Sequence, residues 1–235
     1  MRTRLMVSLV LVAAIGVTAL VMTGGSASAG INPADFTNPM KNPYYPLTPG
    51  RVSVYRGSEG GDQLVEHLTV THQTKQILGV TTTVINDVLF RNGVLGEKTT
   101  DWYAYDNSGN TWYFGEKTAV YKPNGQVQSR EGSWEAGVNG AEAGIIMPAN
   151  PGPTDAYRQE FLAGHAEDQA WIVANHGSVT VPYGTFDQAL RSFEWTRLEP
   201  NVLSLKRYAP HLGIVQEGDV AGGNEFLQLV AVHQH

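Results

Sequence analysis

The sequence predicts a mainly β protein: a single curved antiparallel sheet of the half-barrel or β-clam type, with at most one or two short helices. Short runs rich in Val, Thr, Tyr and Phe follow one another from Arg51 onward, separated by Gly, Pro, Asn and Asp, as strands and their turns are. Their spacing leaves no room for the crossover helices that parallel strands require. Apolar and polar residues alternate in several runs, as in Val52-Ser53-Val54-Tyr55, so we expect one buried face and one that is wet or lines a cavity.

The first 29 residues predict export. Arg2 and Arg4 precede an apolar run at residues 5–22, and Ala27-Ser28-Ala29 supplies the small-residue pattern that a signal peptidase accepts. An apolar run of this length could also just span a bilayer as an uncleaved anchor, but the cleavage pattern favours a signal peptide over residues 1–29. We therefore expect a secreted, soluble protein that begins at Gly30, with no stable membrane anchor after cleavage.

Composition bounds the partners. The chain has no cysteine, which excludes a lipid-modified N-terminal cysteine and disulfides, so the fold must rest on its core. Removing residues 1–29 leaves 14 basic against 22 acidic residues, a net charge of −8. We therefore expect neither nucleic acid nor an anionic membrane as a partner.

The rest of the chain divides into two parts. Residues 30–50 are rich in Pro, Asn and Asp and predict an extended N-terminal lead-in, and residues 51–235 predict a single antiparallel β domain. Residues 166–174 and residues 186–193 combine good helix formers with mixed periodicity, so each could be a short helix instead of a strand.

The densest aromatic segment, DWYAYDNSGNTWYFGE at residues 101–116, predicts a hairpin. Asp106 and Gly109 have the chemistry of a three-residue hairpin loop. The register that follows pairs Tyr105 with Thr111, Ala104 with Trp112, Tyr103 with Tyr113, and Trp102 with Phe114. One face, predicted to be core, then holds Trp102, Trp112 and Phe114, and the other holds Asp101, Tyr103, Tyr105, Thr111 and Tyr113.

The second face of this hairpin is the candidate ligand-binding wall. Tyrosine rings offer flat apolar area with hydrogen-bonding tips, which suits sugars, aromatic metabolites or lipid headgroups. The alternative is that cross-strand tyrosine pairs only stabilise a half-exposed sheet. Glu116, Glu131 and Glu135 would form an acidic rim near the hairpin, in which the carboxylate pair of a glycosidase could lie.

Residues 157–168 predict a second hairpin that turns at Ala163-Gly164-His165. It would place Glu160 opposite Asp168, with Arg158 on the same face. Two opposed carboxylates repel each other, so one must be protonated, metal-bound or neutralised. One interpretation is an acid/base pair or a hard-cation site; the other is a structural network in which Arg158 neutralises the pair.

Other chemistry has little support. His165 and Glu167 are weak metal-ligand candidates, because a catalytic zinc needs three protein ligands, and we expect no metal and no cofactor. The chain lacks a G-x-S-x-G elbow, S-x-x-K, H-E-x-x-H and a phosphate-binding loop.

Five blocks of the sequence resemble a group of exported bacterial proteins of unassigned function: DWYAYDNSGNTWYFGE, GSWEAGVNGAEAGIIMP, YRQEFLAGHAED, VPYGTF and YAPHLGIVQE. The closing Tyr-Gly-Thr-Phe and Tyr-Ala-Pro-x-x-Gly-x-Val patterns are also similar to those of half-barrel proteins related to bacterial lipoprotein carriers. His211 and Leu212 depart from that pattern, which commonly has Gly and Val there. The resemblance implies a curved antiparallel sheet with a concave face and supplies neither a catalytic residue nor a substrate.

The leading hypothesis is a secreted protein that binds a small or lipid-like ligand on the concave face of the sheet. Its candidate ligand-binding residues are Asp101, Tyr103, Tyr105, Tyr113, Glu116 and Arg158. The alternative is a secreted hydrolase that uses paired carboxylates, with or without a divalent cation, and its catalytic candidates are Glu160, Asp168, Glu131 and Glu135. A third class, an extracellular interaction module, would show an exposed apolar patch in place of a pocket.

Overall fold

The computed structural model describes residues 30–235, so the predicted signal peptide lies outside the described residues. Within them the chain forms one four-residue 3₁₀ helix, η1 (Pro33–Phe36), and otherwise strands. The predicted fold class is confirmed. The strands are β1 (Arg51–Glu59), β2 (Asp62–Ile77), β3 (Val80–Arg91), β4 (Val94–Tyr105), β5 (Thr111–Tyr121), β6 (Val127–Ser129), β7 (Trp134–Glu135), β8 (Glu142–Met147), β9 (Ala156–Arg158), β10 (Glu160–Phe161), β11 (Asp168–Ala174), β12 (Val179–Val181), β13 (Gly184–Phe186), β14 (Leu190–Thr196), β15 (Leu203–Ala209), β16 (Gly213–Ala221) and β17 (Phe226–Gln234).

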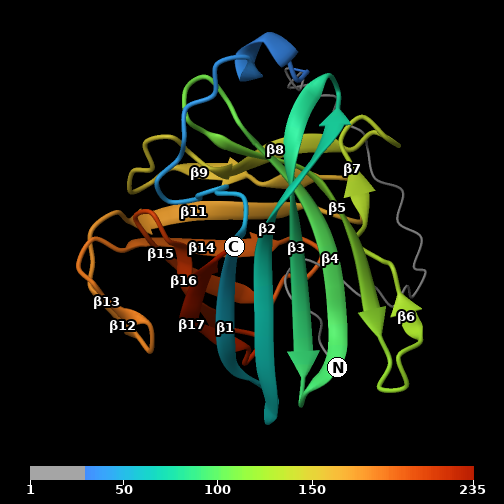
Figure 1. Ribbon diagram of the computed structural model, residues 1–235, viewed down its shortest axis with the longest axis vertical. Coiled ribbons are helices and arrows are strands. Elements are labelled where there is room, and N and C mark those ends of the chain that lie inside the picture. The colour runs from blue at the N-terminus through green and yellow to red at the C-terminus, as the bar shows by residue number, and fades with distance from the viewer. Residues whose placement is uncertain (1–29) are drawn as a thin grey trace.

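Fifteen of these strands form one sheet in the order β10-β8-β5-β4-β3-β2-β1-β17-β16-β15-β14-β11-β9, with β6 and β7 also paired to β5. β12 and β13 make a separate hairpin. Neighbouring strands are antiparallel, and the long strands β1 to β5 lie side by side while β11, β14 and β15 cross behind them (Figure 1). The sheet therefore curves around an interior, as the sequence predicted.

A short segment joins the two edges of this sheet. β9 pairs with β11 at one edge, and β10, which follows after Gln159, pairs with β8 at the other. We call residues 156–161 the closing segment. A Cβ on Gly144 of β8 would lie 2.5 Å from the Arg158 carbonyl oxygen and from the Gln159 carbonyl carbon, so only glycine permits this approach. The closing segment completes a nearly closed, barrel-like curve.

The lead-in, residues 30–50, packs across one end of the sheet, where η1 lies (Figure 1). Phe36 makes edge contacts with Trp112 and Phe114, at ring-centroid distances of 6.0 and 5.6 Å. The buried Asn42 amide donates to the Gly109 carbonyl at 2.9 Å and to the Pro148 carbonyl at 2.9 Å. The buried side chains of the lead-in thus belong to the core of the domain.

Two clusters of buried side chains make up the core. The larger is aromatic and centres on Trp102, Tyr103, Tyr113, Phe114 and Trp134. The smaller is mainly aliphatic and contains Tyr55, Leu64, Val215, Leu227 and Leu229. Leu68 and Ile214 pack against both clusters, so the interior is continuous between them.

Both helix alternatives are wrong. Residues 166–174 end in strand β11, where Ala170 and Ile172 are fully buried and Trp171 between them is 43% exposed. Residues 186–193 span the end of β13 and the start of β14, where buried Leu190 and Ser192 flank exposed Arg191. A period of two emerges because both segments pair with neighbouring strands, and tertiary context outweighs helix propensity.

The register of the aromatic hairpin is correct near the turn and wrong beyond it. Tyr105 pairs with Thr111, Ala104 with Trp112 and Tyr103 with Tyr113, but Trp102 then pairs with Gly115 instead of Phe114. A bulge there adds one residue to β5, and Gly115 adopts φ +134°, where a Cβ would lie 2.4 Å from the Trp134 carbonyl oxygen. The bulge places Asp101 opposite Glu116.

No helix within residues 30–235 is long and apolar enough to cross a membrane.

Candidate functional site: an acidic cavity on the inner face

The inner face of strands β2 to β4 carries carboxylates at positions where apolar residues would be expected. Directly paired inward residues include Leu68 with Asp87, Leu89 with Glu66, and Ile85 with Asp101. Each acid lies two residues from an apolar side chain on its own strand, so the period of two places both on one side of the sheet. The interior of this domain is therefore partly acidic.

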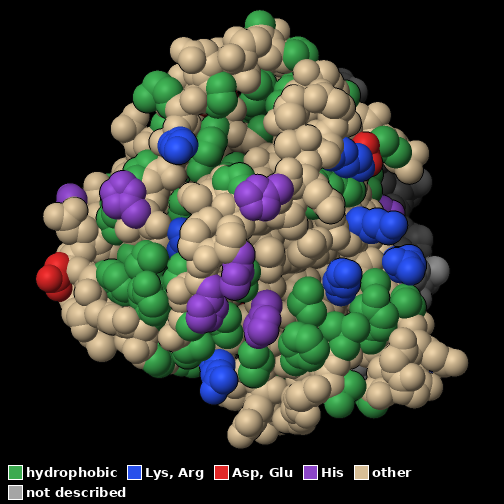
Figure 2. Space-filling model, viewed as in Figure 1, with side chains coloured by type: hydrophobic (Ala, Val, Ile, Leu, Met, Phe, Trp, Pro, Cys, Tyr) green, Lys and Arg blue, Asp and Glu red, His purple; other side chains and the backbone are tan. Residues whose placement is uncertain are grey.

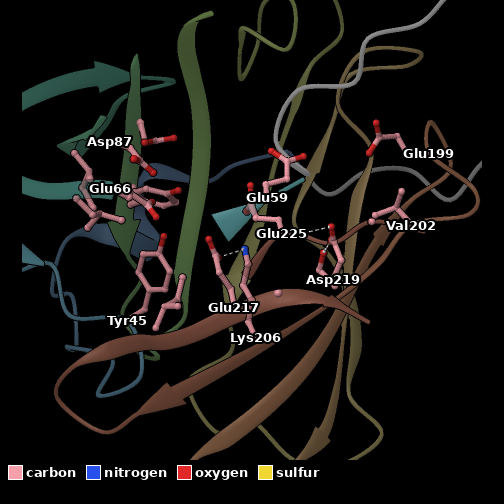
Figure 3. A pocket seen from close by; sticks show the side chains of 18 residues that line it. Tyr45, Glu59, Glu66, Asp87, Glu199, Val202, Lys206, Glu217, Asp219 and Glu225 are labelled. Carbon is pink, nitrogen blue, oxygen red and sulfur yellow. Dashed lines mark hydrogen bonds and ion pairs between the residues drawn. The ribbon is translucent and has the colours of Figure 1, made fainter. Parts of the chain in front are cut away.

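These carboxylates border a cavity of about 80 Å³. It lies between the inner face of β1 to β4 and the strands β15 and β16, with Tyr45 of the lead-in on its wall (Figure 3). Eight carboxylates line it, against one ammonium group, that of Lys206. The eight are Glu59, Glu66, Asp87, Asp101, Glu199, Glu217, Asp219 and Glu225.

Lys206 is the cation of the cavity. Its Nζ lies 2.8 Å from Glu194 Oε2 and 3.8 Å from Glu217 Oε2. Burial lowers the pKa of Lys206, but Glu194 and Glu217 outweigh this effect, and the net shift is upward. The ammonium group is held charged by two carboxylates, only one of which, Glu217, lines the cavity.

Two other lining carboxylates, Glu59 and Asp219, are paired at the edge of the cavity. Arg91 pairs with Glu59 and, through Nη1 at 3.1 Å, with Asp62. Asp219 accepts from the Ser204 hydroxyl at 2.8 Å and from the Glu225 backbone N–H at 3.1 Å. Figure 3 shows Glu66 and Asp87 together on one wall, with Glu217 and Lys206 across from Tyr45.

The predicted tyrosine wall is only partly at the cavity. Tyr103 and Asp101 line it, and the Tyr103 ring lies 5.2 Å from Tyr45. Tyr113 lies behind, stacked on Tyr103 at 4.6 Å, and its hydroxyl donates to Asp101 Oδ1 at 2.8 Å.

Tyr105 is placed elsewhere. Its hydroxyl donates to the Tyr45 carbonyl at 2.9 Å and accepts from the Leu47 N–H at 2.6 Å. Burial raises the pKa of Tyr105 to about 12. These two hydrogen bonds of the Tyr105 hydroxyl attach the lead-in to the sheet.

Glu160 and Asp168 do come close together, but neither lines the cavity. The Glu160 side chain is buried, with 4% exposed, and burial raises its pKa to about 8. Burial, followed by the Glu160 charge, also raises the pKa of Asp168. The two form a group of carboxyls next to the closing segment, in which Glu160 is buried and Asp168 is partly buried.

Glu116 is the third member of that buried group. Burial raises its pKa well above the usual range, and the charges of Glu160 and Asp101 add to the effect. Neither oxygen of Glu116 has a hydrogen-bond partner, since the nearby Tyr113 hydroxyl donates its single proton to Asp101. A protonated carboxyl costs less than a charged one at such a position.

Arg158 does not neutralise the Glu160–Asp168 pair. Its guanidinium pairs with Glu142 and lies 4.4 Å from the ring centre of Phe161. The cation whose charge acts on both Glu160 and Asp168 is Lys206. That interpretation of Arg158 is therefore wrong.

The acidic rim does not form. The Glu135 carboxylate pairs with Lys75 at 2.6 Å, and the Lys75 ammonium lies 3.5 Å from the ring centre of the buried Trp102. Glu116 faces the interior, one ladder position from Glu135, and Glu131 lies in a partly exposed turn. These three carboxylates thus share no site.

Of the two weak metal candidates, His165 and Glu167, the second is engaged otherwise. Glu167 accepts from the Gly164 N–H at 2.9 Å and from Arg197 Nε at 2.7 Å. Among residues 30–235, no three His, Asp or Glu side chains are arranged to hold a metal ion.

Sequence reasoning missed most of the cavity, including Glu66, Asp87, Lys206 and Glu217. A signal was present in the strands: Leu64-x-Glu66-x-Leu68-x-Val70 and Ile85-x-Asp87-x-Leu89 each place an acid within the apolar parity. An acid in that parity must face the interior.

The fold and the cavity define a nearly closed antiparallel β half-barrel with an acidic interior. No family model matches the sequence, and no curated protein matches it. Two solved structures are similar. One, described as an exported protein with a YmcC-like fold from Bacteroides fragilis, is 13% identical, with 81% of this chain and 99% of that chain covered at a TM-score of 0.49. The other, described as a lipoprotein from Parabacteroides distasonis, is 15% identical, with 83% and 100% covered at a TM-score of 0.46.

Proposed function

We propose that the protein is a secreted binding protein that takes a small, positively charged organic ligand, such as an amine, into the acidic cavity. The observation that carries this proposal is the lining of the cavity, where eight carboxylates face a single ammonium group. The same proposal has two further parts. The signal peptide is cleaved during export, and the protein belongs to the exported group whose sequence blocks it resembles.

Like charges gathered in a concave, low-dielectric site repel each other and focus an electric field on the space between them. A cation that enters this space relieves the repulsion and gains charge-assisted hydrogen bonds. The rings of Tyr45 and Tyr103 on the wall add apolar area and a face that attracts an ammonium group. The lining therefore favours a cation over a neutral ligand.

The carboxylates of the cavity would repel an anionic headgroup. They therefore oppose those lipid-like ligands, among the ones that the sequence suggested, that carry such a headgroup. The hydrolase alternative is also less well supported, because its paired carboxylates, Glu160 and Asp168, do not line the cavity. A catalytic acid must reach hydrogen-bonding distance of the substrate, and Glu160 is buried. We therefore favour binding over hydrolysis.

The test is isothermal titration with the diamine putrescine and with spermidine, with succinate as a four-carbon dianion for comparison. We expect both amines to bind and succinate not to bind. The double variant Glu66→Gln/Asp87→Asn should bind the amines at least about tenfold more weakly, because each removes a charge-assisted contact of about 1.5–3 kcal/mol.

The matched control is Glu131→Gln/Asp187→Asn, which removes two acids outside the cavity and should bind as the native protein does. Urea unfolding of all three proteins verifies that they are folded. Absence of heat with both amines, or equal binding by the two double variants, would contradict the proposal.

A further inference from the structure

The outer face of the same sheet has the opposite charge. Three rows of side chains cross it, each from β17 to β4 or β5. One runs His233, Val52, Thr69, Asn86, Thr100, Lys117; the second Ala231, Val54, His67, Val88, Lys98, Ala119; and the third Gln228, Arg56, Val65, Phe90, Leu95. We call these residues the outer rows.

None of the outer rows contains an Asp or a Glu. Arg56, Lys98 and Lys117 are exposed there, together with the imidazoles of His67 and His233. Figure 2 shows this face: Lys, Arg and His are spread across it, and Asp and Glu appear only toward the edges of the view. The acids of β1 to β5 point instead to the inner side, so the sheet separates charge between its two faces.

Between the cations lie partly exposed apolar side chains. Val54 and Val88 flank His67 in the second row, and Val65 pairs with Phe90 in the third. The Phe90 ring is 5.9 Å from the His67 ring in an edge contact. Cations interleaved with apolar groups suit the boundary between lipid headgroups and acyl chains.

The net charge of −8 does not forbid such a contact. At physiological ionic strength an exposed charge is screened over about 8 Å, so an approaching surface responds to the side chains nearest to it. On the outer face these are cationic, and the acids lie on the far side of the sheet. The net charge of the whole chain, which predicted no anionic membrane partner, averages over two faces of unlike charge.

We propose that the outer rows dock the exported protein on an anionic lipid surface, which leaves the acidic cavity on the inner side of the sheet. Charge complementarity carries the proposal: each Lys or Arg near an anionic bilayer contributes about fivefold to partitioning. It is independent of what the cavity binds, because it involves none of the cavity-lining residues.

The experiment is co-sedimentation of the secreted protein with vesicles of phosphatidylcholine containing about one-third phosphatidylglycerol, compared with pure phosphatidylcholine. The test variant is Arg56→Gln/Lys98→Gln/Lys117→Gln. The matched control is Lys41→Gln/Lys122→Gln/Arg130→Gln, which removes the same charge from exposed positions outside the outer rows. All proteins share one N-terminus, so differences between them report on the substituted residues alone.

We expect binding to the anionic vesicles that weakens as salt is raised, a loss of at least about tenfold in the test variant, and a much smaller change in the control. Equal binding to neutral vesicles, no binding by the native protein, or an equal loss in both triple variants would overturn the proposal. Sedimentation without vesicles would show self-association through this face and would also overturn it.

Discussion

Several carboxyl groups are buried in the interior of this domain. Asp101, Glu116 and Glu160 are each less than 5% exposed, and a buried charge is costly unless it is paired or protonated. Asp101 receives the Tyr113 hydroxyl, whereas burial and neighbouring carboxyls raise the pKa of Glu116 and burial raises that of Glu160. The fold thus accommodates several buried carboxyl groups partly because some of them stay protonated.

The first prediction concerns pH. The pKa of Glu160 is about 8 in the folded protein, against about 4.3 in the unfolded chain, so between these values the folded state holds a proton that the unfolded state has lost. This contribution to stability is fully present below about pH 4.3 and is lost as the pH rises through 8. Glu160→Gln should therefore flatten the fall in stability between pH 5 and 8.

Urea unfolding at pH 5, 6.5 and 8 measures this slope. Glu131→Gln serves as the control and should leave the slope as it is in the native protein. Glu116 and Asp168 are shifted in the same direction, so the slope is reduced without being abolished. An unchanged slope in Glu160→Gln would show that this carboxyl is ionised in the folded state.

The second prediction is that Tyr113→Phe destabilises the fold by about 1–3 kcal/mol, because it removes a hydrogen bond to the buried Asp101 carboxylate. The exposed Tyr183→Phe should change stability by less than about 0.5 kcal/mol. Denaturant unfolding of both variants at one pH is the measurement. A loss in Tyr113→Phe no larger than in Tyr183→Phe would mean that this hydroxyl contributes little.

At the scale of elements, the closing segment determines whether the half-barrel is closed. The third prediction is that Gly144→Ala costs at least about 1–3 kcal/mol, because its Cβ would overlap the backbone at Arg158 and Gln159. Gly96→Ala, in β4, is the matched control, because its Cβ would meet nothing closer than 3.5 Å.

Amide hydrogen exchange locates the effect of Gly144→Ala. We expect faster exchange in β8, β9 and β10 and unchanged exchange in β2 and β3, because only the former pack at the closing segment. Uniformly faster exchange across the sheet would indicate global destabilisation and would contradict the role assigned to the segment.

The elements also show how far sequence patterns reach. Turn chemistry at Asp106 and Gly109 predicted the hairpin and its first three pairs, since these depend on local geometry. The bulge at Gly115 was not predictable, because it depends on the approach of β7, a segment distant by about twenty residues. The two supposed helices failed for the same reason: their strand pairing comes from other parts of the chain.

For the whole molecule, the fold class could be predicted because alternation and short spacings constrain it directly. The cavity could not be predicted, because its lining comes from the lead-in, from β1 to β4, from β15 and β16, and from the loops that precede β15 and follow β16. The adjacency of these parts follows from sheet order and curvature. Of the predicted ligand-binding residues, Asp101 and Tyr103 line the cavity, whereas Tyr105, Tyr113, Glu116 and Arg158 do not. Single-strand parity identifies inward acids, but not which of them meet.

The measurement that tests the central claim most directly is native mass spectrometry of the protein purified from the medium of its own host, alongside Glu66→Gln/Asp87→Asn prepared in the same way. We predict that the measured mass corresponds to a chain that begins at Gly30. We also predict a small basic organic adduct on the native protein, which is lost on denaturation and is absent from the double variant. An anionic or lipid adduct retained by both proteins, or no adduct on either, would contradict the assignment of the acidic cavity as a site for cations.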